Sequence, residues 1–322
     1  MMTDPGRVAW VVEGPQIPAH VASVRYSALL PARLLGGTVL PFGPGDDAEA
    51  LLRKFRPGAL VFSKMFSDAP MALFRAARAA AIPTVAAMCD LRFQLPHNLT
   101  VARDADVVVT PCAAMAEAIR QDVGRSAVVI EDPYEGPRDA PRFSPGEALR
   151  LVWFAHRSNL ETLLPCLGQL AEVANRRMEI RLVTNATPQA IGELFSLLPA
   201  PRSEVDCQSI SWSLENQWAE IAAADIVLLP TLPERTMAVK GHNRLVLALH
   251  RGRFSLAHRL PAYEELADFC WCGDDFAEGL EWAIANPGNV LARIEAGQRV
   301  AEERFSPAAA AKRWADLLAT LG

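Results

Sequence analysis

The sequence predicts an α/β protein made of two doubly wound domains, each with a parallel sheet that helices cover on both faces. Short apolar runs alternate along the chain with segments of helical periodicity. These runs are continuous rather than alternately apolar and polar, which is typical of parallel strands buried on both sides. A proline-rich segment interrupts the alternation after residue 133, and the alternation then restarts.

The first domain is expected over residues 1–136. Its apolar runs are rich in β-branched residues, as buried strands are. The helix over 46–58 has acidic residues in its first turn and cations in its last, which suits the helix dipole. The expected strands span residues 7–12, 38–43, 59–64, 83–90, 105–111 and 126–133. The expected helices span residues 23–37, 46–58, 69–82 and 112–124.

An interdomain linker is expected over residues 137–149, and the second domain over 150–304. A last helix lies within 305–322, where Ser306 suits the capping position and Pro307 the first helical position. The strands of the second domain are expected over residues 150–155, 178–185, 208–213, 225–230, 254–258 and 270–273. Its helices are expected over residues 161–176, 188–198, 216–224, 242–252, 263–269, 276–286 and 290–303.

Length and charge narrow the class of protein. The 322 residues are enough for two domains, and 51% of them are hydrophobic, so each domain can bury a sizeable core. The net charge of −5 excludes nucleic acid as an expected partner. An anionic ligand would therefore be bound by a local cluster of cations rather than by the field of the whole protein.

The six cysteines are scattered and form no C-x-x-C pair, so we expect free thiols in a reducing cytosol. The amino-terminal segment lacks the cationic and apolar regions of a signal peptide. No apolar run reaches the roughly 18 residues that a membrane-spanning helix needs. The sequence thus predicts a cytoplasmic protein, and peripheral contact with the inner membrane stays open.

Charge and polarity gather where the strand over 225–230 leads into the helix over 242–252. Lys240 precedes this helix, and Asn243 and Arg244 lie at its start. A helix amino terminus offers unpaired amides to an anion, and doubly wound sheets bind ligands at the carboxyl ends of their strands. We therefore expect a diphosphate at these three residues; a solvated loop with incidental cations is the alternative.

Other strand ends of the second domain carry polar side chains. Arg157 follows the strand over 150–155 and could add a second cation for phosphate, or belong to a polar loop. Thr184 and Asn185 end the next strand and suit the border of a nucleobase or ribose. Trp212 could cover a base. The cleft between two such domains is the expected binding site.

In the first domain, Arg25 and Lys64 follow the first and third strands and are candidates to contact an acceptor. Asp90 and His97 follow the fourth strand and are candidate catalytic residues. Asp90 is the better candidate for a general base, and a capping role is about equally compatible with its position. Neither domain has a G-x-G-x-x-G turn, which disfavours a nicotinamide enzyme, and no metal site is expected.

The order of several segments resembles GT-B glycosyltransferases, in particular the family-four-like members of bacteria. In the second domain these are "LVWFAHRSN", "RLVTN", "DIVLLP", "KGHNRLVLALHRG" and "LPAYEEL". In the first domain "ASVRYSALLPARLLGG", "LVFSKMF", "MCDLRF" and "ADVVVTPCAAMAEAI" are similar to the acceptor-side half. The resemblance implies GT-B architecture, with two Rossmann-like domains facing a cleft and the helix within 305–322 packing back on the first domain.

The resemblance also implies a function. A glycosyltransferase of this kind moves a sugar from a nucleotide diphosphate sugar to a glycan, lipid-linked or other acceptor, as in polysaccharide biosynthesis, without a metal or cofactor. The second domain would bind the donor, with its diphosphate at Lys240, Arg244 and Arg157. Cations and helix amides can neutralise the departing diphosphate, which is electrostatic stabilisation of the transition state.

One family motif is degenerate. Family-four members usually carry two glutamates seven residues apart, of which the second holds the donor ribose. Here that helix position is Leu247, and Glu234 lies in the preceding loop. The segment 240–244 is similar to a K-S-N-N-R-like segment of bacterial sequences that also lack the pair. A non-catalytic binding or scaffold protein and a sugar-nucleotide epimerase therefore stay open, as do the donor, the acceptor and the stereochemistry.

Overall fold

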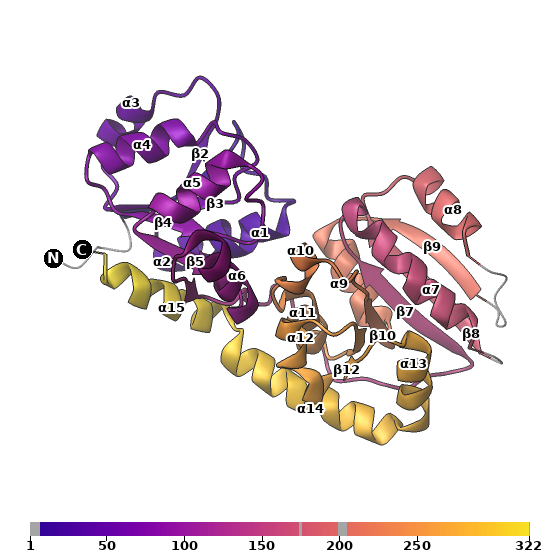
Figure 1. The fold of residues 1–322 in the computed structure, drawn as a ribbon. Helices are drawn as coiled ribbons and strands as arrows, with labels where there is room; N and C mark the ends of the chain where they lie inside the picture. The colour runs from indigo at the N-terminus through magenta and orange to yellow at the C-terminus, as the bar shows by residue number, and fades with distance from the viewer. Residues whose placement is uncertain (1–6, 174–175, 199–204, 322) are drawn as a thin grey trace. The chain divides into compact units, whose positions relative to one another are not determined.

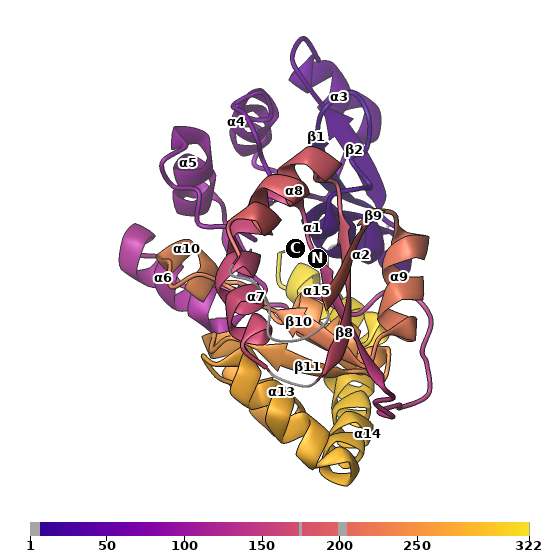
Figure 2. The same ribbon diagram turned by 90° about the vertical axis from the view of Figure 1, so that its right-hand side faces the viewer.

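The computed structural model describes residues 7–173, 176–198 and 205–321. These residues form two compact units (Figures 1 and 2). Unit 1 comprises the chain up to Pro133, the segment Val239–His242 and the chain from Phe305 on, and unit 2 comprises the segments between them. Each unit contains a six-stranded parallel sheet, which confirms the predicted fold class of two doubly wound α/β domains.

The sheet of unit 1 has the strand order β2-β1-β3-β4-β5-β6, and all neighbouring strands are parallel. Successive residues of β1 face opposite cores: Ala9 and Val11 join one apolar cluster, and Trp10 and Val12 the other. The strands are β1 (Val8–Glu13), β2 (Thr38–Phe42), β3 (Ala59–Ser63), β4 (Thr84–Ala87), β5 (Val107–Thr110) and β6 (Val128–Val129).

Helices cover both faces of this sheet (Figure 1). They are α1 (Ala22–Val24), the π-helical turn η2 (Arg25–Leu29), α2 (Leu30–Leu35), α3 (Ala48–Phe55), α4 (Met71–Ala79), α5 (Pro96–Asp104), α6 (Ala113–Val123) and α15 (Pro307–Ala319). In α15 the Ser306 hydroxyl accepts a hydrogen bond from the Ala309 amide at 3.2 Å. Trp314 packs edge-on against Trp10 with 6.3 Å between ring centroids, and Leu318 is fully buried. This helix therefore completes the core of unit 1.

The sheet of unit 2 has the order β12-β11-β10-β7-β8-β9. Its strands are β7 (Ala148–Phe154), β8 (Arg177–Thr184), β9 (Val205–Ser211), β10 (Ile226–Leu229), β11 (Phe254–Ala257) and β12 (Trp271–Cys272). Its helices are η3 (Arg157–Thr162), α7 (Leu163–Ala171), α8 (Pro188–Ser196), α9 (Leu214–Ala223), α10 (Arg235–Ala238), α11 (Asn243–His250), α12 (Pro261–Glu264), η4 (Ala267–Phe269), α13 (Phe276–Ala285) and α14 (Pro287–Arg304). From β7 the chain adds β8 and then β9 on one side, and it then returns to add β10, β11 and β12 on the other side of β7. The topological switch point therefore lies between β7 and β10.

The structure differs from the expected elements in a few places. The strand expected over 126–133 pairs through Val128 and Val129 alone, at the edge of the sheet. The helices α5 and α10 were not expected. In α5 the buried residues include the polar His97 and Asn98, so its sequence lacks the apolar periodicity that marks a core helix.

Two arginines, Arg142 and the buried Arg253, fix the segment that enters β7. Arg253 is 4% exposed, and its guanidinium donates to the carbonyls of Ala140 at 3.0 Å, Gly252 at 2.8 Å and Ala222 at 3.2 Å. Arg142 donates to Ala223 at 2.7 Å, near the carboxyl end of α9. Burial, together with the charge of Arg142, lowers the pKa of Arg253 to about 10, so it remains charged at neutral pH. The cations satisfy carbonyls that the end of α9 leaves unpaired.

All six cysteines are free thiols. Burial raises the pKa of Cys166 and of Cys270, which keeps both protonated and unreactive at neutral pH. Among the described residues, no helix combines the length and the apolar character that a membrane crossing requires.

Candidate functional site

The carboxyl edge of the unit 2 sheet collects the polar residues expected to bind the donor. The strands β10, β7 and β8 are adjacent and parallel, so the segments that follow them share one edge. Arg157 follows β7, Asn185 follows β8, and Arg244 lies in α11, which is reached from β10. This edge includes the topological switch point, where doubly wound sheets bind their ligands.

Hydrogen bonds fix the segments after β7 and β8. The Asn185 side-chain oxygen accepts from the Arg157 amide at 2.8 Å, which ties the two segments together. The His156 ring accepts from the Ser158 amide at 3.2 Å and caps η3. Thr184 is buried, and its hydroxyl accepts from the Ala186 amide at 3.3 Å. Asn185 and Thr184 therefore shape the edge of the sheet through bonds to the backbone.

Trp212 follows β9 at the same edge of unit 2. Its amide donates to the Thr184 carbonyl at 3.0 Å, and its indole nitrogen donates to the Gln217 side chain at 2.8 Å. The ring is half-buried and held at both ends. A fixed, partly exposed aromatic face is suited to stack on a planar ligand.

Arg244 lies in the first turn of α11, directly after Asn243. Among the described residues, its Nη1 atom is buried without a hydrogen-bond partner. A guanidinium carries a full positive charge and presents rigid donors that match phosphate oxygens. A buried, unpaired donor costs free energy, so Arg244 is suited to an anion at this helix start.

Lys240 belongs to unit 1 in the structure, whereas Asn243 and Arg244 belong to unit 2. Its ammonium contacts the Asp90 carboxylate. The three residues expected to bind one diphosphate thus have different local partners: Lys240 is paired with an acid, and no described residue bonds to Nη1 of Arg244.

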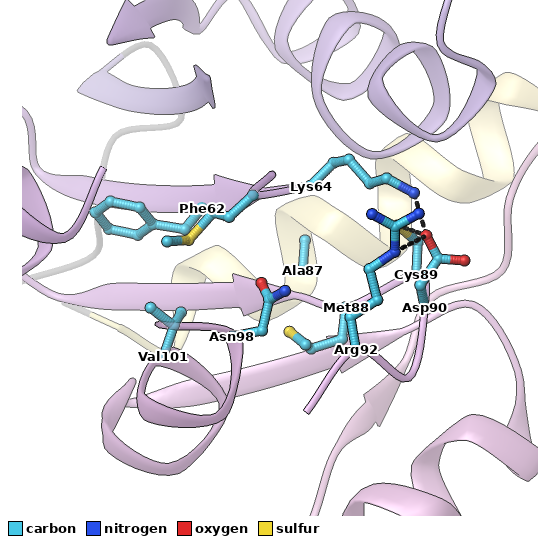
Figure 3. A pocket seen from close by; sticks show the side chains of 10 residues that line it. Phe62, Lys64, Ala87, Met88, Cys89, Asp90, Arg92, Asn98 and Val101 are labelled. Atoms are coloured by element: carbon cyan, nitrogen blue, oxygen red, sulfur yellow. Dashed lines mark hydrogen bonds and ion pairs between the residues drawn. The ribbon is translucent and has the colours of Figure 1, made fainter. Parts of the chain in front are cut away.

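The Asp90 pocket of unit 1, which we define by Lys64, Asp90, Arg92, Asn98 and the apolar residues behind them, lies at the carboxyl ends of β3 and β4 (Figure 3). The ammonium of Lys64 contacts one oxygen of Asp90, and Arg92 Nε lies 3.9 Å from that same oxygen. Asn98 reaches the pocket from α5.

Asp90 is an ionised acceptor in this arrangement. Burial opposes its ionisation, but the charges of Lys240 and Lys64 and their hydrogen bonds outweigh this effect and lower the pKa of Asp90 to about 2. A general base works best with a pKa near the operating pH. With both oxygens in contact with cations, Asp90 is suited to position Lys64 and Lys240 rather than to accept a proton.

The other first-domain candidates do not line the Asp90 pocket. His97 is buried on α5, and its Nε2 has no hydrogen-bond partner among the described residues; its neighbour Asn98 lines the pocket instead. Arg25 is buried in η2 and donates to the Ala19 carbonyl at 3.0 Å. Of these candidates, the structure brings Lys64 and Asp90 together.

The sequence did not indicate two residues, one that holds a segment beside the pocket and one that lines it. Glu13, at the end of β1, accepts from the Ser67 amide at 2.9 Å and from the Ser67 hydroxyl at 2.5 Å, and so holds the segment after β3. Asn98 lines the pocket from α5. The position of Glu13, directly after an apolar run, could have indicated a role at the end of the strand. No sequence pattern near Asn98 indicated that it lines a pocket.

The low pKa of Asp90 predicts a specific pH dependence of stability. An acid whose pKa falls from 3.8 to about 2 on folding stabilises the native state above pH 3.8, by about 2 kcal/mol, and loses this contribution as the pH falls through about 2. Asp90→Asn should therefore lower the free energy of unfolding by a constant amount near neutral pH, and the difference from wild type should shrink below about pH 4. Urea titrations from about pH 7 to about pH 2.5 measure it.

The matched control for this experiment is Glu49→Gln, which removes an exposed pair with Arg53 on α3. It should change the free energy of unfolding by less than about 1 kcal/mol. A stability loss in Asp90→Asn that grows toward low pH would show that the carboxylate is not held ionised by its cations.

Comparison with known proteins adds to these observations. No protein-family model and no curated protein matches the chain. HepE from Anabaena, solved with UDP-glucose, is 14% identical, with 97% of this chain and 99% of that chain covered and a TM-score of 0.69. A glycosyltransferase from Rickettsia africae is 11% identical over 98% of each chain, with a TM-score of 0.70. MurG from Acinetobacter baumannii is 13% identical over 97% of this chain and 99% of that chain, with a TM-score of 0.52.

These similarities extend over nearly the whole chain at low identity, so they establish the fold. The chain has the GT-B fold of these glycosyltransferases, and the resemblance drawn from the order of sequence motifs is confirmed at that level. The narrower family-four-like assignment stays a prediction.

Proposed function

We propose that the protein is a glycosyltransferase that takes its sugar from a nucleotide diphosphate sugar bound to unit 2. The observation that carries this proposal is Arg244, whose buried Nη1 lacks a partner among the described residues at the start of α11. The fold supports it, because HepE, with the same fold, binds UDP-glucose and also UDP with glucose.

The diphosphate is proposed to lie at the carboxyl edge of β10 and β7. Arg244 and the first amides of α11 would bind its oxygens, and Arg157, at the start of η3, would add a second cation. The same groups would stabilise the negative charge that develops on the diphosphate as the bond to the sugar breaks. This charge neutralisation is proposed to make a metal unnecessary.

The nucleoside is proposed to lie near Thr184, Asn185 and Trp212, with the Trp212 ring as a stacking surface. Leu247, at the position of the family's ribose-binding glutamate, is 2% exposed and part of the core around α11. The ribose must therefore be held by another residue of this edge. The acceptor is proposed to be a glycan or a lipid-linked or other glycoconjugate, with the protein acting in the cytoplasm.

A binding protein without turnover is the second candidate. Two observations favour it: Leu247 replaces a donor-binding acid, and Asp90, the candidate base, is paired with two lysines at a pKa of about 2. Both candidates predict donor binding, and release of nucleotide diphosphate separates them.

A thermal-shift screen with UDP-, GDP-, ADP- and dTDP-sugars, and with a CMP-sugar, which has a single phosphate, as the control, tests the proposed function. A donor at 100 times its dissociation constant stabilises the native state by about 2.7 kcal/mol, so one of these compounds should raise the melting temperature measurably. Steady release of nucleotide diphosphate in the presence of acceptor would identify a transferase. If none of the four diphosphate sugars raises the melting temperature, the proposed donor site is wrong.

A further inference from the structure

The Asp90 carboxylate is surrounded by more positive than negative charge. Lys64 and Arg92 line the pocket and pair with one carboxylate oxygen, and Lys240, from the segment Val239–His242, pairs with the other. Three positive charges against one negative charge leave an excess of two. The other side chains that line the pocket are neutral, so they do not compensate this excess.

Lys64 and Asp90 form the buried centre of this cluster, and the other two cations are partly exposed. The side chain of Lys64 is 12% exposed and that of Asp90 is 14% exposed, so little water screens this pair, whereas Lys240 is 37% exposed. Arg92 is 43% exposed, and among the described residues its guanidinium has no hydrogen bond, since its contact with Asp90 is 3.9 Å long. Its donors are therefore available to a ligand at the mouth of the pocket.

The backbone at Lys64 points to a function for this residue. Its φ of 34° lies in the left-handed region, which is uncommon for a residue with a long side chain. The bonds from the Ser67 amide and hydroxyl to Glu13 fix the segment that follows and so maintain this conformation. Backbone strain of this kind persists mainly at functional sites, where it aims a side chain. Here it aims the Lys64 ammonium at Asp90.

We propose that the Asp90 pocket binds the acceptor substrate through a phosphate monoester. This inference rests on the proposed function, because it names the chemistry of the acceptor. A phosphate monoester carries a charge of about −1.5 to −2 at pH 7, which matches an excess of two, whereas a carboxylate would neutralise half of it. Arg92 and Lys64 bind the phosphate oxygens, and Asn98 offers an amide to the same group or its neighbour.

Asp90 has a positioning role in this site. Its carboxylate holds Lys64 and Lys240 in place, and its low pKa keeps this function at physiological pH. The phosphate can belong to a soluble acceptor or to a lipid headgroup. Both sources present the same group, so the experiment includes one arm for each.

The binding arm uses the full chain with Arg244→Gln as background, so that the proposed donor site does not contribute phosphate binding. Calorimetry should show that glycerol 3-phosphate binds at least about tenfold more tightly than glycerol. Arg92→Gln and Lys64→Gln should each weaken this binding about tenfold. Arg53→Gln, an exposed cation on α3, should leave it unchanged. Arg92 is a surface residue, so this variant remains informative if Lys64→Gln impairs folding.

The lipid arm uses phosphatidylcholine vesicles with and without phosphatidic acid. Cosedimentation that needs phosphatidic acid and is lost in Arg92→Gln would place the phosphate on a lipid. Binding of glycerol 3-phosphate without vesicle binding would place it on a soluble acceptor. Vesicle binding that Arg92→Gln does not alter would count against the pocket.

The transfer arm compares glucose 6-phosphate with glucose as acceptor, together with the donor found by thermal shift. Glucose 6-phosphate should have the higher kcat/KM, and Arg92→Gln should abolish this preference without changing KM for the donor. In one outcome, the donor binds while neither glycerol 3-phosphate nor phosphatidic acid binds through Arg92 and Lys64. That result would contradict the phosphate site and leave the proposed function supported. If glycerol 3-phosphate binds and no donor does, the proposed function fails while the phosphate site remains.

Discussion

The Arg244→Gln variant is expected to bind the nucleotide diphosphate sugar about 10- to 150-fold more weakly than wild type. A charge-assisted hydrogen bond to phosphate contributes about 1.5–3 kcal/mol, and glutamine removes the charge while keeping an amide donor. The turnover number should fall as well, because negative charge on the departing diphosphate increases in the transition state. Calorimetry measures the first effect, and release of nucleotide diphosphate measures the second.

The control is Arg259→Gln, which changes an exposed arginine of unit 2 whose Nε lies 4.0 Å from Asp274. It should leave donor affinity unchanged. Lys240→Gln should have a smaller effect than Arg244→Gln, because the Lys240 ammonium is already paired with Asp90. Equal losses in the two variants would mean that Lys240 binds the diphosphate, as the sequence predicted, and leaves Asp90 to do so. Donor affinity that survives in Arg244→Gln would remove the diphosphate assignment.

Arg253→Leu is expected to lower the free energy of unfolding by about 3 kcal/mol or more. The substitution keeps an apolar stem but leaves the carbonyls of Ala140 and Arg251 without the donor that satisfies them. The carbonyls of Ala222 and Gly252 keep hydrogen bonds from Arg142. Each buried polar group that loses its partner costs about 1–3 kcal/mol. Urea unfolding followed by tryptophan fluorescence measures the shift of the midpoint.

The matched control replaces Arg259, which is largely exposed, by leucine. Its effect on the free energy of unfolding should lie within about 0.5 kcal/mol. Arg253→Lys should recover part of the loss, since an ammonium retains the charge but not the forked geometry that reaches several carbonyls. A midpoint for Arg253→Leu equal to that of Arg259→Leu would show that the carbonyls find other partners.

Most of the fold could be predicted because its signal is local. Buried parallel strands such as β3 and β10 are continuous apolar runs, and the proline-rich segment before β7 separates the two alternating series. The strand orders were not predicted, because pairing between distant strands depends on helix packing that no short segment encodes. The helix α5 was missed for a local reason, since buried polar residues hide its periodicity.

The site was predicted in part. Strand ends pointed to Lys64, Asp90, Arg157 and Arg244, because ligands of doubly wound sheets bind there. Their partners were not predictable: the contact of Lys240 with Asp90 joins residues that lie 150 positions apart in the chain. The roles of Arg157, Thr184, Asn185, Trp212 and Arg244 toward a donor stay predictions until binding is measured.

The place of α15 in unit 1 has a consequence for biosynthesis. Trp10 and its neighbours on one face of the first sheet pack against Trp314 and Leu318, which leave the ribosome long after β1 to β6 have been made. The core of unit 1 is therefore completed only after unit 2 has been translated.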